Sequence, residues 1–257
     1  MIYNAARLPE APRTWEDLRL LARAQPSSIG IKGARYEGLS CDFFPFLWQA
    51  GGDPLAPQSS AALEAMTFFA ELRSGIHPGS VSFRENTLLQ AQEHEEVLLH
   101  FNWPFVVPLL REKGLLPGKI QTAPLPVGPV GSATVLGGGY LGIPLTAPHP
   151  ESAARLLEFL TSDQTERRLL TELGWFPPRR GAWDALDEET RQAARGFIEM
   201  KDQVRARPSI RDYDRISALW QTAITQVLFE GVEPKTALID LTRKMRQQLE
   251  ASSQGGE

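Results

Sequence analysis

Disulfide bonds, membrane-spanning segments and an excess of basic charge are all missing from this sequence. Cys41 is the only cysteine, so no intrachain disulfide can form and we expect a buried, inert thiol. No apolar run approaches the roughly 20 residues that cross a bilayer, which argues against membrane insertion. The formal net charge is −4, and a mildly acidic surface of mixed sign argues against nucleic acid as a partner. Arg207, Arg211 and Arg215 have helical spacing, but a solvated face with one functional member explains them better than a nucleic-acid patch.

Motifs for catalysis are also scarce. Gly137-Gly138-Gly139 lacks the spacing and the following lysine of a phosphate-binding loop, and no Gly-x-Ser-x-Gly motif occurs. The cluster 93–96 contains one histidine, but consecutive helical residues point in different directions, so a solvated face explains it better than a metal site. Carboxylates are plentiful but lack the paired signature that a glycosidase would need. We therefore expect a protein that is not an enzyme and needs no metal or cofactor.

Helical patterns dominate the sequence. Thr14 has Asp17 three positions on, as in a capping box, and Asp163 has Glu166 at the same spacing. Helices are predicted over 14–24, 41–50, 59–75, 86–95, from 104, over 150–161, 163–174, 187–201, 214–229 and from 234. Short strands are predicted over 1–3, 28–32, 97–101, 134–136 and 140–143. Many helices with a few short strands predict an α/β fold, in which helices flank a modest sheet.

Two segments have the composition of a surface that binds sugar. Aromatic faces stack on the apolar face of a pyranose, and fixed polar groups bind its hydroxyls. Trp103 and Phe105 flank a rigid proline at a predicted strand-to-helix turn, and Gly137–Tyr140 lets the backbone approach a ligand closely. The residues alone leave plainer alternatives open, namely core aromatic side chains for the first segment and a flexible turn or β-bulge for the second.

At these segments the sequence resembles the solute-binding proteins of bacterial ABC sugar importers, in particular the maltose- and trehalose-binding branch. Each matching stretch is weak alone, but together they keep the family's order over nearly the whole chain. The stretches are 2–4 with 12–18, 35–39, 46–52, 102–105, 137–142, 159–162 and 173–179. The resemblance implies a two-lobed periplasmic-binding-protein-like fold that closes on a sugar ligand, and relatives of full length act with an ABC transporter permease.

The resemblance also implies which residues bind the ligand. Trp103, Phe105 and Trp220 would stack on the sugar, and Arg207 matches a sugar-binding arginine of the trehalose-type branch. Backbone or side-chain contacts are implied at Gly138, Gly139 and Tyr140, and Tyr36 and Glu37 are further candidates. Two positions depart from the family pattern. Gly139 stands where many relatives have tryptophan, and Phe105 lacks the hydroxyl of the common tyrosine.

Relatives carry a long stretch before the part that matches the start of this chain. The resemblance therefore predicts a nearly complete C-terminal lobe from residues 1–132 and 197–257, and a remnant of the N-terminal lobe from residues 133–196. It implies a periplasmic or extracytoplasmic location. The opening Met1-Ile2-Tyr3-Asn4 has no signal peptide, so the chain expressed as given would be cytoplasmic.

Two functions follow from this shortened form. The first is a truncated carbohydrate-binding component of an ABC importer for maltose- or trehalose-type oligosaccharides. The alternative is a lobe that self-associates and no longer binds sugar, because apolar residues such as Leu156, Leu157, Phe159 and Leu160 would be exposed. A homodimer through residues 133–196 would cover them.

Overall fold

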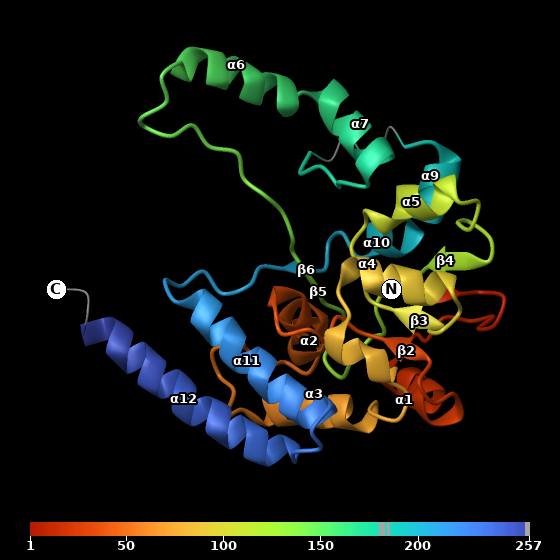
Figure 1. The fold of residues 1–257 in the computed structure, drawn as a ribbon, viewed down its shortest axis with the longest axis vertical. Helices are drawn as coiled ribbons and strands as arrows, with labels where there is room; N and C mark the ends of the chain where they lie inside the picture. Colours follow the sequence, from red (N-terminus) through yellow and green to blue (C-terminus); the bar gives the residue numbers. More distant parts are fainter. Residues whose placement is uncertain (180–182, 184–185, 255–257) are drawn as a thin grey trace.

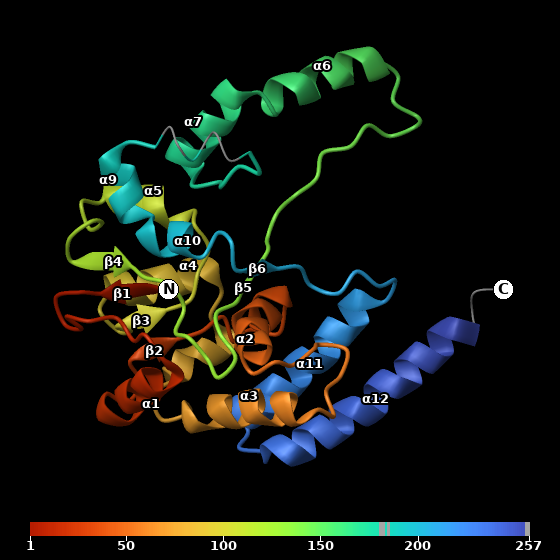
Figure 2. The same ribbon diagram turned by 180° about the vertical axis from the view of Figure 1, so that it is seen from behind.

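The chain folds into a body and a projecting arm (Figures 1 and 2). The computed structural model describes residues 1–179, 183 and 186–254. We define the body as residues 1–135 and 186–254, and the arm as residues 136–179. None of the helices in these residues is long and apolar enough to cross a membrane. The mixed α/β architecture confirms the predicted fold class.

A four-stranded sheet lies in the body, with the strand order β2-β3-β1-β4. Its strands are β1 Ile2–Asn4, β2 Ile29–Gly30, β3 Leu99–His100 and β4 Ile120–Thr122. β1 runs antiparallel to both β3 and β4, whereas β2 and β3 are parallel, with Gly30 opposite His100. Because parallel strands end at the same edge, the chain after Gly30 and the chain after His100 leave the sheet side by side.

The body helices follow the sequence pattern closely. They are α1 Trp15–Ala24, α2 Glu37–Gln49, α3 Ser60–Glu71, α4 Glu85–Glu93, α5 Val106–Glu112, α9 Glu188–Ala193, α10 Arg195–Glu199, α11 Tyr213–Leu228 and α12 Pro234–Gln254, with a 3₁₀ turn at Pro78–Ser82. The predicted capping box of Thr14 and Asp17 is present. Two details differ. The helix after Pro104 begins only at Val106, and the stretch predicted as one helix over 187–201 is divided at Ala194.

Aromatic side chains fill the core between α2, α3 and α11. In α2 every residue except Glu37 is buried, as expected for a helix that is apolar on all sides. The Phe43 ring lies edge-on to Phe69 at 4.9 Å between centroids, and Trp15 stacks on Phe68 at 4.1 Å. α11 packs on α2, α3 and α12 and closes this core from the C-terminal side.

The arm leaves the body at a two-stranded parallel pair of β5 Thr134–Val135 and β6 Val204–Arg205. It then contains α6 Pro150–Leu160 and α7 Asp163–Leu173. Ser162, rather than the predicted Asp163, caps α7. Gly174 ends the helix as predicted, and its backbone is left-handed. Residues 140–143 do not form the predicted strand, because no neighbouring strand pairs with their backbone.

The α9–α10 segment packs on the body sheet, and Phe197 of α10 also contacts Phe176 at the end of the arm. Thr122 Oγ1 donates a hydrogen bond to Ala193 O at 2.8 Å and accepts one from Gly196 N at 3.1 Å. Ala193 and Ala194 share a second core cluster with Ile2 and Ile120. The chain therefore returns to the body sheet through α9 and α10.

Candidate ligand-binding site

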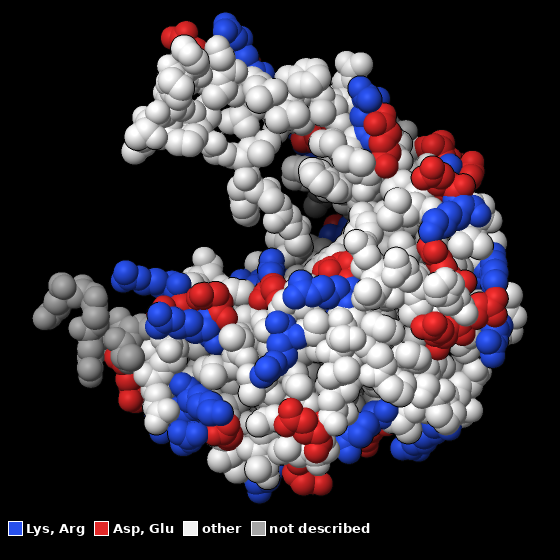
Figure 3. All heavy atoms as spheres, in the orientation of Figure 1, with Lys and Arg blue, Asp and Glu red and all other residues white. Residues whose placement is uncertain are grey.

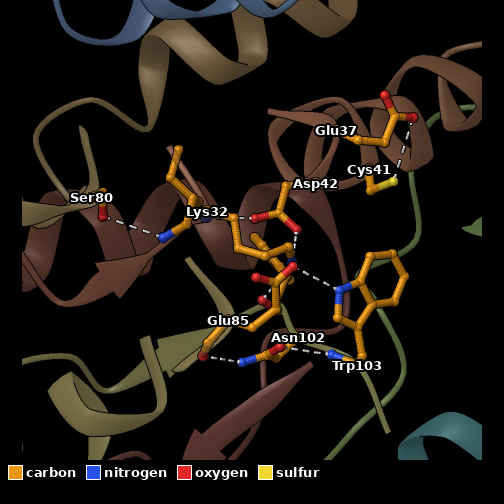
Figure 4. A network of polar contacts seen from close by, with 10 residues as sticks. Lys32, Glu37, Cys41, Asp42, Ser80, Glu85, Asn102 and Trp103 are labelled. Carbon is orange, nitrogen blue, oxygen red and sulfur yellow. Dashed lines mark hydrogen bonds and ion pairs between the residues drawn. The ribbon is translucent and has the colours of Figure 1, made fainter. Parts of the chain in front are cut away.

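The loop after β3 carries Trp103 to the junction of body and arm, where neighbouring residues fix it (Figure 4). The Trp103 backbone N–H donates to Asn102 Oδ1 at 2.9 Å, and Asn102 Nδ2 donates to Glu85 O at 2.9 Å. The indole Nε1 donates to Glu85 Oε1 at 3.2 Å. The ring is partly buried, not sealed in the core. The loop therefore presents an indole whose edge is tied to the start of α4.

A buried ion pair lies beside this indole. Lys32 and Asp42 are only 2% and 3% exposed, and their side chains form a short ion pair. Lys32 Nζ also donates to Phe101 O at 3.0 Å and lies 5.1 Å from the centroid of the Trp103 ring. Burial raises the pKa of the Asp42 carboxyl, while the Lys32 ammonium lowers it. The charges are therefore satisfied inside the protein, with the ammonium held against the indole.

The glycine segment begins beside Trp103 and then leads away from it. A Cβ on Gly137 would lie 3.7 Å from Trp103 Cζ3, whereas a Cβ on Gly138 or Gly139 would meet nothing within 4 Å. Tyr140 is 101% exposed. The structure thus brings the predicted stacking residue and the start of the glycine run together, but it leaves the next three predicted contact residues in the open.

Phe105 takes a different direction from Trp103. It is partly buried and packs against the second core cluster of the body. Gly174, at the end of α7, lies so close to this loop that a Cβ there would come within 2.8 Å of Phe105 Cα. The loop that carries the two predicted stacking residues therefore has arm glycines on two sides, Gly137 near Trp103 and Gly174 near Phe105.

A second polar cluster surrounds Glu37 at the first turn of α2. Its carboxylate accepts hydrogen bonds from Arg207 Nη1 at 2.8 Å, from Tyr213 Oη at 2.5 Å and from Ser217 Oγ. Burial and the bond to Glu37 raise the pKa of Tyr213. Burial also raises the pKa of the nearby Cys41 thiol to about 12, which agrees with an inert cysteine. The structure brings the predicted Arg207 and Glu37 together as a partly exposed ion pair.

Tyr36 links the two clusters. Its ring lies under the Arg84 guanidinium, 4.4 Å from that carbon to the ring centroid. Burial and the nearby Glu85 carboxylate raise the pKa of the Tyr36 hydroxyl. The Tyr36 oxygen is buried beside the Glu85 carboxylate. Tyr36 is therefore a neighbour of the residue that holds the Trp103 indole.

Trp220 lies in the core and not at the ligand site predicted from the sequence. Its ring is 0% exposed and packs against Phe43 and Phe44, and its Nε1 donates to Pro54 O at 2.8 Å. No face of the ring is accessible to a ligand in this conformation. The stacking role predicted for Trp220 is therefore wrong for this structure, because its helix turns it into the core.

Several residues of the site escaped the sequence analysis: Lys32, Asp42, Glu85, Tyr213 and Ser217. Two of them carried a readable signal. Lys32 ends an apolar predicted strand, and Asp42 is an acid inside the apolar stretch 41–50. A charge in such a place needs a buried partner of opposite sign. Two oppositely charged residues in neighbouring apolar segments therefore predict a buried ion pair, which is the Lys32–Asp42 pair of the structure.

The cluster 93–96 is a solvated face. Glu93 pairs with Lys113 and Glu95 with Lys119, and all four side chains are accessible. Among the described residues, no three potential ligands lie close enough to hold a metal ion. The acids on this face are therefore engaged in ion pairs on the surface.

The geometry is that of one wall of an open groove. Figure 3 shows a wide hollow between arm and body, and the side of the arm that borders it is largely free of charged residues. On the body, Trp103 next to Gly137 and the Arg207–Glu37 pair are partly exposed, and the Lys32–Asp42 pair lies buried behind Trp103. An accessible aromatic face beside fixed polar groups can hold a ligand with an apolar face and a hydroxyl rim.

A family model described as bacterial extracellular solute-binding protein matches residues 1–167. A probable ABC transporter-binding protein of Deinococcus radiodurans is 26% identical over 262 residues, which cover 92% of this chain. The alignment covers 61% of that relative, so this chain spans less than two thirds of its length.

Solved structures show the same fold. The maltose-bound MalE3 of T. maritima superposes with a TM-score of 0.85 and 27% identity, over 96% of this chain and 69% of that one. A solute-binding protein of Thermotoga lettingae bound with α-D-tagatose gives a TM-score of 0.81 and 25% identity, with the same coverage of both chains. The periplasmic sugar-binding architecture is thus present in this chain over about 70% of the length of these proteins.

Proposed function

This chain belongs to the bacterial extracellular solute-binding protein family, and from that premise we propose that it binds a neutral sugar without altering it. The sugar class is the maltose- or trehalose-type oligosaccharide, and the role is that of the solute-binding component of an ABC importer. The observation that carries the proposal is Trp103, a partly buried indole that is fixed at its edge by Glu85 and lies next to Gly137 at the start of the arm.

The charges around Trp103 support a neutral ligand. Lys32 is paired with Asp42, and Arg207 with Glu37. A charged ligand would have to break one of these pairs and leave its partner without compensation, which is costly when that partner is buried. A sugar stacks on the ring and exchanges hydroxyl contacts with water at little electrostatic cost.

Further contacts complete the proposed site. Arg207 and Glu37 present their exposed edges to ligand hydroxyls, and Tyr36 and Phe105 support the site from beside Glu85 and Trp103. Gly138, Gly139 and Tyr140 provide backbone and aromatic contacts from the arm. The proposed lobes are residues 1–132 with 197–257 and residues 133–196, and the chain would act with a permease outside the cytoplasm, where the family's name places it.

Titration calorimetry with maltose, trehalose, sucrose and glucose tests this proposal. We expect saturable heat with at least one disaccharide, and Trp103→Ala weakens it on the order of tenfold or more because a stacking aromatic face is lost. Trp175→Ala is the matched control, since Trp175 is an exposed indole of the arm outside the proposed site. Equal affinity in wild type and Trp103→Ala contradicts the placement of the sugar, and no heat with any sugar contradicts the function.

Self-association through residues 133–196 is a second candidate function, favoured by the arm's exposed apolar side chains. Leu156 and Phe159 of α6 are 56% and 63% exposed, and apolar patches of this kind favour association. We expect a mass above one chain by light scattering, and Leu156→Ser with Phe159→Ser lowers it. Leu20→Ser, at an exposed leucine of α1, is the control. A single-chain mass for the wild type at all concentrations rules this candidate out.

A further inference from the structure

We propose that Glu85 and the buried Lys32–Asp42 pair are positioning residues for the Trp103 ring, holding it in the free protein so that one face is open to a ligand. That the ligand is a sugar rests on the proposed function. The fixing of the ring does not, because it is a property of the protein before any ligand arrives.

Lys32 holds the face of the Trp103 ring. Lys32 Nζ is 5.1 Å from the Trp103 centroid, a distance at which an ammonium is attracted to an indole face. The same nitrogen is bound to Asp42 and to Phe101 O. Its position is therefore fixed by two oxygens, one of them in the backbone that leads into the Trp103 loop. One face of the indole is thereby occupied, and a ligand can use only the other.

Glu85 holds the edge of the ring. Glu85 Oε1 accepts the indole N–H at 3.2 Å, and Glu85 O accepts from Asn102 Nδ2 at 2.9 Å. A carboxylate at the first turn of α4 thus fixes rotation of the ring within its plane, while its backbone holds the preceding residue. Burial raises the pKa of Glu85, but hydrogen bonds from its own backbone, from Tyr36 and from Trp103 lower it below its ordinary value. The carboxylate therefore accepts this bond in its ionised form.

Ordinary stability does not explain a lysine at this place. A buried ion pair replaced by apolar side chains of similar volume commonly leaves a protein equally stable or more so. Lys32 and Asp42 come from two different segments, and both converge on the strand end that carries Trp103 (Figure 4). What the pair adds over an apolar core is a fixed cation at the indole and a fixed carbonyl before it.

Fluorine NMR of the protein labelled with 5-fluorotryptophan tests the positioning directly. The chain has six tryptophans, and Trp103→Phe identifies the resonance of Trp103. We expect Glu85→Ala and the double variant Lys32→Met/Asp42→Asn to broaden or shift that resonance alone, while Glu85→Gln, which keeps an acceptor, restores it. The surface pair variant Lys244→Met/Asp240→Asn is the control. A Trp103 resonance unchanged in Glu85→Ala, which alters only a partly exposed side chain, overturns the proposal.

Calorimetry with the sugars named above separates this proposal from the proposed function. We expect Glu85→Ala and Lys32→Met/Asp42→Asn to weaken sugar affinity about tenfold, the size of a lost cation–π or hydrogen-bond constraint. If Trp103→Ala loses affinity while both positioning variants bind like wild type, the positioning is overturned and the proposed function stands. If wild type binds no sugar, the proposed function fails, and the Trp103 resonance alone decides the positioning.

Discussion

The body buries its apolar side chains, whereas the arm exposes them. In α2, twelve residues are buried, and in α6 not one is buried. Both are helices of ordinary length, and α6 has apolar residues on one side, including Leu156 and Phe159. α2 is apolar on nearly all sides and is enclosed, whereas the apolar side of α6 is left exposed, although most helix stability in proteins comes from packing of such a face. Within the arm, α7 packs on α5 and buries Leu170, whereas α6 has no layer packed on its apolar side among the described residues.

Truncation of a large side chain is the strongest way to test this contrast. Phe43→Ala in the body removes a fully buried ring, and we expect the free energy of unfolding to fall by about 3–5 kcal/mol. Phe159→Ala in the arm removes an exposed ring, and we expect a change within about 0.5 kcal/mol. Urea unfolding followed by circular dichroism measures both. Equal losses at the two sites would show that the arm is packed in solution.

Acid provides a second test, because it acts on a histidine buried in the body sheet. His100 is fully buried in β3, and burial lowers its pKa from 6.5 to about 3. Between these values the unfolded chain binds more protons than the folded one, so the free energy of unfolding falls as pH falls. From pH 7 to pH 5 we expect this histidine to cost about 2 kcal/mol.

Two histidine variants test whether His100 causes this loss of stability at low pH. His100→Gln keeps a polar side chain next to Gln92, its hydrogen-bond partner, and should lose less stability than wild type over the same pH range. His94→Gln, at an exposed histidine, should behave as wild type does. Urea unfolding at pH 7, 6 and 5 measures the slopes. Parallel slopes for wild type and His100→Gln would refute the assignment.

Helix caps provide the smallest and most local test. Thr14 Oγ1 accepts from Asp17 N at 3.1 Å in the body, and Ser162 Oγ accepts from Thr165 N at 3.4 Å in the arm. We expect Thr14→Ala to lower the free energy of global unfolding by about 1 kcal/mol. Ser162→Ala should leave global unfolding unchanged and speed hydrogen exchange only within α7, because the arm opens locally. A lower free energy of global unfolding in Ser162→Ala would show that the arm unfolds together with the body.

Local signals in the sequence predicted the helices well, because caps and glycine stops act within a few residues. The Thr14 capping box and the Gly174 stop are both present. Strand 140–143 failed because a strand needs a partner that its own residues do not encode. The fold class was therefore predictable, and the pairing of the arm segment was not.

The candidate site was predictable only in part, because a match to a family motif does not show whether a side chain points into the core or toward a ligand. Trp103 was found at an accessible turn, but Trp220 was assigned to the ligand although it lies four residues after Ile216, on the same buried stripe of α11. That helical spacing was visible and indicated core. Lys32 and Asp42 needed the opposite inference, that a charge in an apolar segment must find a partner across the fold.

Gly174 has a left-handed φ of +65° and no room for a side chain beside Pro104 and Phe105. An alanine there would have to displace either the end of α7 or the Trp103 loop. A substitution at Gly174 would thus alter the position of the Trp103 indole, although Gly174 is not among the residues that hold the ring. The end of α7 therefore packs directly against the backbone of the Trp103 loop, and this contact requires glycine at position 174.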